Sequence, residues 1–149
     1  MKTEIINNLN AEKEIRLLID LYANYADTKQ TDKQVALFTD NYKVEIYYDS
    51  TAATPTQTVE GKENLKQLFI NSLSPFLKTM HFNGQSIIKI TSETTATAIV
   101  YCRAYHYSKE GETEKLMIAP IRYEDKFENI NDQWYFSERK LKVQWTENR

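Results

Sequence analysis

The hydrophobic period of this chain changes at Lys78, from a helical spacing to the alternation of strands. Before that point apolar residues recur three and four positions apart, as in Ile15, Leu18 and Ile19, which is typical of a helix that packs on a core. After it, four long segments have an alternating pattern, at residues 79–91, 94–107, 116–127 and 134–145. Short turn-forming segments separate them and favour antiparallel hairpins. The sequence therefore predicts an α+β fold with its helices near the N-terminus.

Three helices are expected in the first half of the chain. Asn10 is a good N-cap, so the first helix is predicted from Ala11 to about Ala26. The other expected elements are helices over residues 32–38 and 61–75, a strand over 42–48 and a short returning strand over 57–60. A chain of 149 residues suits one core. The predicted organisation is an N-terminal tail over residues 1–9 and a single domain over residues 10–149.

Composition limits the partners of the protein. The 19 basic and 21 acidic residues are mixed along the chain and give a net charge of -2, so we expect no nucleic-acid or membrane partner. No apolar run approaches the roughly 20 residues of a membrane span, and the N-terminus lacks the apolar region of a secretory signal. A soluble, cytoplasmic protein is expected. Cys102 is the one cysteine, and its place in a strand pattern indicates a buried thiol.

The segment 94–107 predicts which face of the sheet meets the helices. Its even positions are small or apolar until His106, and small side chains leave room for a helix. Its odd positions include Tyr101, Arg103 and Tyr105, residue types that are enriched at protein interfaces. We therefore expect His106 to point toward the helices, and we expect a homodimer built on the outer face of the sheet.

The chain has only two histidines, His81 and His106, each near an end of a predicted strand. Asp27 stands where the first helix ends. Histidine suits proton transfer because its ordinary pKa lies near neutrality. We predict that Asp27 orients His106 as a general base, and that His81 or Tyr48 donates a hydrogen bond to the developing enolate.

Three further tyrosines, Tyr22, Tyr25 and Tyr47, are candidates for substrate binding because each could present an O–H group to a cavity. No metal ion or organic cofactor is expected, since no HxH or HxD spacing is present.

Each candidate also has a structural interpretation. Either histidine could be a half-buried strand residue bonded to a backbone carbonyl, and Asp27 could complete a helix terminus. Asp125 and Arg139 are interpreted as structural polar contacts near a sheet edge. The charged run at residues 138–140 is interpreted as mostly solvated surface.

The order of elements and motifs resembles the SnoaL-like branch of the NTF2-like superfamily. The motifs that carry the resemblance are Asp27, Leu37-Phe38-Thr39-Asp40, Val59-Glu60-Gly61, Thr79-Met80-His81, Arg122-Tyr123-Glu124-Asp125 and Gln133-Trp134. The resemblance implies a cone-shaped, cystatin-like fold in which a curved sheet wraps around the helices and encloses a cavity. The superfamily includes dehydratases, isomerases, polyketide cyclases and non-catalytic modules, so the fold alone does not name a reaction.

The scytalone dehydratases of this superfamily are similar at four site positions. Those positions are Asp27, Tyr48, His81 and His106 here, whereas Ala26 stands where those enzymes have a tyrosine. The resemblance implies a cofactor-independent lyase or isomerase that acts on a small hydrophobic, oxygenated or polyketide-like molecule. The alternative is a non-catalytic module that binds a small ligand or a protein. An enzyme should bring Asp27 and His106 together in an open, partly apolar pocket.

Overall fold

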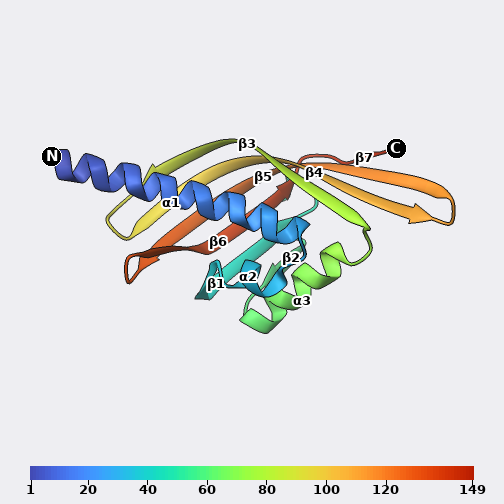
Figure 1. The fold of residues 1–149 in the computed structure, drawn as a ribbon, viewed down its shortest axis with the longest axis horizontal. Coiled ribbons are helices and arrows are strands. Elements are labelled where there is room, and N and C mark those ends of the chain that lie inside the picture. Colours follow the sequence, from blue (N-terminus) through green and yellow to red (C-terminus); the bar gives the residue numbers. More distant parts are fainter.

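The computed structural model describes residues 1–149 and contains three helices and a seven-stranded sheet (Figure 1). The helices are α1 (Lys2–Asp27), α2 (Thr31–Val35) and α3 (Lys62–Leu73). The strands are β1 (Phe38–Tyr47), β2 (Gln57–Val59), β3 (Lys78–Ile90), β4 (Thr95–Glu110), β5 (Thr113–Ile130), β6 (Gln133–Val143) and β7 (Glu147–Asn148). None of the helices is long and apolar enough to cross a membrane.

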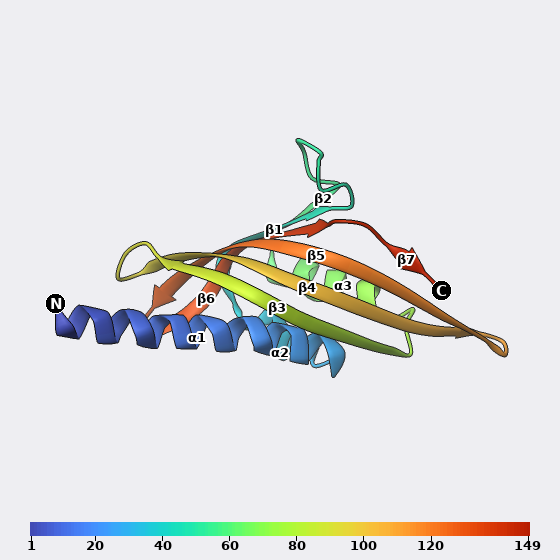
Figure 2. The same ribbon diagram turned by 90° about the horizontal axis from the view of Figure 1, so that it is seen from above.

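Helix α1 begins at Lys2 rather than at the predicted Ala11. Residues 1–10 are all exposed, and Asn10 lies inside the helix instead of capping it. The extension is explained by cooperativity: once the packed part of a helix has formed, each further residue adds one hydrogen bond at little cost. From Ile15 onward the predicted apolar stripe is buried, and α1 runs along one side of the sheet (Figure 2).

The sheet has the strand order β2-β1-β6-β5-β4-β3, and β7 pairs with β5. All pairs are antiparallel except β1 with β6, which are parallel. The sheet is curved, and the hairpin that joins β4 to β5 projects beyond the helices (Figure 1). The four predicted hairpin segments are thus β3 to β6, with bounds shifted by a few residues.

Strand β4 has the predicted division between its two faces. Its even residues from Ala96 to Ala104 are buried, and Val100 and Ala104 are fully covered. These small side chains face the helices, as the alternation predicts. The outer face is more open, since Arg103 is exposed and 40% of Ile99 is accessible.

Two β-bulges change which residues face the core. Between Asn83 and Ser86, β3 takes three steps while β4 takes two, from Cys102 to Val100. On β6 the step from Phe136 to Glu138 opposes a single step on β5. Each extra residue reverses the inward parity of its strand beyond the bulge.

The β6 bulge corrects one expectation from the sequence. Trp134 and Phe136 are buried before the bulge, and Arg139 is buried after it, with only 1% of the residue exposed. Arg139 therefore lies in the core and not on a solvated surface. The other two residues of the charged run, Glu138 and Lys140, are only partly buried.

Candidate functional site

A carboxylate and an imidazole meet where α1 ends beside β3. Asp27 is the last residue of α1, and its Oδ1 lies 2.7 Å from Nδ1 of His81. The backbone N–H of His81 donates to Oδ2 at 2.8 Å, and the hydroxyl of Thr79 donates to Oδ1 at 2.9 Å. The carboxylate is therefore fixed by three donors from a single strand, and it joins residues more than fifty positions apart in the chain.

These bonds determine the charge of Asp27. Partial burial opposes ionisation of the carboxyl group, but the hydrogen bonds from His81 and Thr79 outweigh it and lower the pKa of Asp27. An ionised carboxylate can only accept hydrogen bonds. In neutral His81 the proton must then sit on Nδ1, which leaves the lone pair on Nε2. This is the arrangement of a histidine prepared to act as a base.

His106 lies beside this pair but is not part of it. Its ring centre is 6.0 Å from that of His81 and 4.7 Å from that of Phe76. Its Nδ1 is 3.4 Å from the carbonyl oxygen of Met117. Burial, aided by the nearby charge of His81, lowers the pKa of His106 and favours the neutral ring.

The pairing differs from the prediction that Asp27 orients His106, because the structure joins Asp27 to His81. The two histidines lie on neighbouring strands and face the same side, with Thr79 opposite His106 in register and His81 opposite Ala104. Asp27, at the end of α1, contacts His81 on β3 and not His106 on β4.

Both histidines line a cavity of about 380 Å³ between the helices and the sheet. Helices α1, α2 and α3 form one wall, and strands β1 and β3 to β6 form the other. Of its 21 lining residues 15 are hydrophobic, as expected of a small-molecule site with few polar groups. The size suits a molecule of one or two rings.

Arg139 brings a positive charge to the same cavity. Its guanidinium carbon lies 3.5 Å from the ring centre of Tyr123 and 4.1 Å from that of Tyr22. Its Nε lies 3.0 Å from Oδ1 of buried Asp125. Burial raises the pKa of Asp125 to about 7, although Arg139 opposes that shift. The pair is central, on β5 and β6, and not at the sheet edge predicted from the sequence.

The tyrosine candidates separate into two groups. Tyr22 and Tyr48 line the cavity, although Tyr48 is 65% exposed and so lies at its mouth. Tyr47 faces the other side of β1, where its hydroxyl donates to Glu45. Tyr25 does not line the cavity, and its ring packs beneath the ammonium group of Lys33. Tyr25 and Tyr47 therefore do not meet the histidines.

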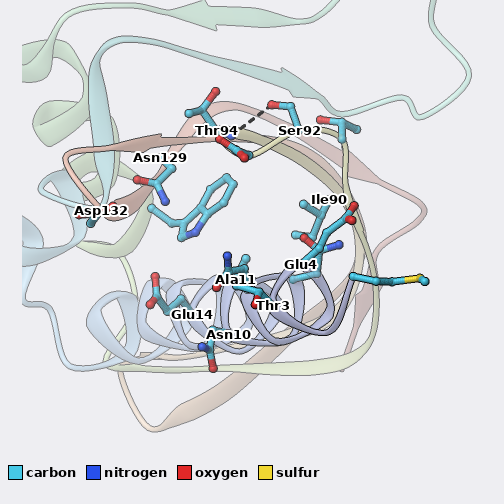
Figure 3. Close-up of a pocket in the computed structure, with 16 residues that line it drawn as sticks. Thr3, Glu4, Asn10, Ala11, Glu14, Ile90, Ser92, Thr94, Asn129 and Asp132 are labelled. Atoms are coloured by element: carbon cyan, nitrogen blue, oxygen red, sulfur yellow. Dashed lines mark hydrogen bonds between the residues drawn. The ribbon is translucent and has the colours of Figure 1, made fainter.

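A second hollow lies at the other end of α1 (Figure 3). It is larger, about 980 Å³, but it is open and lined mostly by asparagine, acidic and hydroxyl side chains. Neither histidine reaches it, so the smaller, apolar cavity is the better candidate for chemistry. No three His, Cys, Asp or Glu side chains come together as a metal site anywhere in the chain.

Sequence reasoning missed the two buried polar residues of the cavity that lie beside the histidine site, Arg139 and Gln34. Leu141 and Val143 have the same parity as Arg139 and are apolar, a signal that places all three on one face. For Gln34 no comparable signal exists, because its position in a helix of five residues gives no periodicity to read.

Comparisons with known proteins agree with this architecture. A family model described as the SnoaL-like domain matches residues 7–140. No curated protein sequence matches the chain.

Several solved structures are similar over most of their length. A candidate scytalone dehydratase from Novosphingobium aromaticivorans has a TM-score of 0.81 and 23% identity, covering 96% of this chain and 90% of that chain. A hexachlorocyclohexane dehydrochlorinase, LinA type 2, has a TM-score of 0.80 and 17% identity, with coverage of 97% and 92%. A cystatin-like protein of unknown function from Nostoc punctiforme has a TM-score of 0.71 and 21% identity, with coverage of 89% and 90%. These likenesses concern the fold, and they confirm the predicted cystatin-like α+β architecture.

Proposed function

We propose that this chain, which belongs to the SnoaL-like family, is a cofactor-independent lyase or isomerase of the dehydratase type. Its substrate would be a small hydrophobic, oxygenated or polyketide-like molecule bound in the cavity between helices and sheet. One observation carries the proposal: the Asp27 carboxylate holds Nδ1 of His81 at 2.7 Å beside an apolar cavity. That geometry leaves Nε2 as the basic nitrogen.

The proposed reaction begins with removal of a proton next to a carbonyl group. His81 Nε2 takes the proton, and the C–H electron pair moves into the carbonyl group to form an enolate. His81 becomes an imidazolium, whose charge the Asp27 carboxylate stabilises. The enolate electrons then return to form a C=C bond, and a β-hydroxyl group leaves as water with the proton from His81. In an isomerase the same proton returns to a different carbon.

We expect three groups of the cavity to stabilise the negative oxygen. Tyr48 lies at the mouth of the cavity, so its hydroxyl can donate to the oxyanion. His106 lies beside His81 and can donate from a ring nitrogen. Arg139 also lines the cavity, and its guanidinium group, which is paired with Asp125, can donate a further hydrogen bond to the oxyanion.

The test uses two probes sized for the cavity. In D₂O, the protein should accelerate exchange of the α-protons of 2-tetralone, followed by proton NMR, because this step needs the base alone. It should also convert 3-hydroxy-1-tetralone to 1-naphthol and water, followed by naphthol fluorescence. His81→Gln should abolish both activities.

The control variant is Asp20→Asn, which changes an exposed polar residue of α1 that also contacts β3, through Asn83, but lies outside the cavity. It should leave both rates unchanged. Exchange no faster than in buffer, or equal rates in wild type and His81→Gln, would contradict the proposal and favour a binding module.

A further inference from the structure

Gln34 is the buried residue of α2, and it is polar. Only 1% of the residue is exposed, and it lines the same cavity as the histidines. Its Oε1 is fully covered and has no hydrogen-bond partner in the protein. Of the six other glutamines, which are all more exposed, three make side-chain hydrogen bonds, namely Gln30, Gln67 and Gln144, and the other three are open to water. The glutamine with most need of a partner therefore lacks one.

An unsatisfied amide in an apolar wall is costly, because burial removes its water without replacing the hydrogen bonds. A leucine or methionine would fill the same volume without that cost. Buried polar groups without protein partners are uncommon, and a ligand or an ordered water usually meets them. The position of Gln34 on a cavity wall supplies the space for such a partner.

The segment that carries Gln34 is held in place by Lys62. The ammonium group of Lys62 donates to the carbonyl oxygens of Val35 and Phe38, at 3.3 and 2.6 Å. These bonds fix the end of α2 against α3. The backbone at Gln34 is thus anchored by its neighbours, which fixes the position from which this residue meets the cavity.

We propose that Gln34 is a specificity-determining residue, which binds a hydroxyl or carbonyl group that the substrate carries on its ring system in addition to the reacting carbonyl. This inference rests on the proposed function and narrows its substrate class to ring compounds with a second oxygen substituent. The amide nitrogen Nε2 is not covered and can donate to a hydroxyl or carbonyl oxygen, and half a turn about the last side-chain bond would exchange it with Oε1, which could then accept from a hydroxyl. Either bond replaces the cavity water, and an apolar substituent of the same size cannot.

The experiment compares two ligands that differ at one substituent, 2-naphthol and 2-methylnaphthalene. Dissociation constants are measured by NMR titration for wild type and for Gln34→Met, which conserves length and removes the amide. The preference for the naphthol over the methyl compound should fall about fivefold in Gln34→Met, the equivalent of one net hydrogen bond. Binding of 2-methylnaphthalene should stay the same or improve.

The control variant is Gln67→Met, on the exposed side of α3 and outside this cavity, which should keep the wild-type preference. A second measurement needs no substitution: 2-naphthol should shift the side-chain amide resonances of Gln34 in wild type, and 2-methylnaphthalene should shift them less. An unchanged preference in Gln34→Met, an unmoved Gln34 amide, or no naphthol binding up to its solubility limit would each overturn the inference.

The outcome is separable from that of the proposed function. Ligand preference is an equilibrium property and needs no catalysis, so it is unaffected if His81 proves not to be a base. If 2-tetralone exchange is catalysed but the naphthol preference survives in Gln34→Met, the reaction stands and the role of Gln34 fails. If the preference is lost while exchange is absent, Gln34 binds ligands in a non-catalytic site.

Discussion

Replacing Asp27 by asparagine is the sharpest test of the His81 geometry. The oxygen of the introduced amide can still accept from the backbone N–H of His81, which the strand holds in place. The new NH₂ group then faces His81 Nδ1, which must become an acceptor. The proton of neutral His81 moves to Nε2, and the basic lone pair is withdrawn from the cavity.

The size of the effect follows from the lost charge. The carboxylate stabilises the imidazolium formed in the reaction. With the two charge centres about 4 Å apart and an effective dielectric constant of about 20, their attraction is about 4 kcal/mol, which corresponds to about a thousandfold in rate. The change of tautomer acts in the same direction, so a thousandfold is the lower bound we expect for 2-tetralone exchange.

Two measurements on Asp27→Asn decide the matter. Nitrogen-15 NMR of the His81 ring should show the protonated nitrogen changing from Nδ1 to Nε2, and the exchange rate should fall as above. The variant should stay folded, since each lost hydrogen bond costs about 1–3 kcal/mol. A ring that keeps its proton on Nδ1, or a rate within tenfold of wild type, would refute the reasoning.

Four other outcomes are expected. Arg139→Met should lower the free energy of unfolding by about 3–5 kcal/mol, because it leaves a buried carboxylate unpaired; adding Asp125→Leu should restore most of it, and a double variant no more stable in urea than the single one would contradict this. Cys102 is buried with a pKa raised to about 12, so iodoacetamide at pH 8 should label it only after unfolding, and rapid labelling of the native protein would be contrary. Burial lowers the pKa of His106, so its NMR titration should have a midpoint below 6.5; since the unfolded chain then binds its proton more tightly, stability should rise with pH between that midpoint and 6.5, and a midpoint above 6.5 would reverse the sign. We also propose that the outer face of the sheet forms a homodimer, in which case Tyr101→Glu should weaken association in sedimentation experiments, whereas a wild type that stays monomeric well above micromolar concentration would exclude it.

The fold was largely predictable because hydrophobic residues recur at regular spacing over long segments in both halves of the chain. Alternation along β4 assigned the inner face correctly, down to Val100 and Ala104, both fully buried. The start of α1 was not predictable, since residues 1–10 all remain exposed and so bury no apolar face that would leave a pattern in the sequence. Arg139 was misplaced because an alternation rule assumes constant parity, and the bulge on β6 breaks it.

The proximity of the three candidate residues was predictable, but the pairing between them was not. Asp27, His81 and His106 were all expected near one cavity, and the structure brings them there. Which histidine the carboxylate binds depends on where α1 ends relative to β3, a distance that no local pattern encodes. Gln34 was out of reach for a related reason, because a helix of five residues has too few positions to define a face.

At the bulge on β3, the number of residues between Asn83 and Ser86 matters more for the site than which residues they are. His81 faces inward on one side of the bulge, and Ile88 packs on the core on the other side, at opposite parity. At Gly84 an added Cβ would lie 3.6 Å from the Cβ of Tyr101, an ordinary contact, so substitutions there are tolerable. Deleting one residue between Asn83 and Ser86 would instead force a choice, because either His81 or Ile88 would have to face outward. A single insertion or deletion at this bulge could therefore turn His81 away from the cavity while the pairing of the other strands is kept.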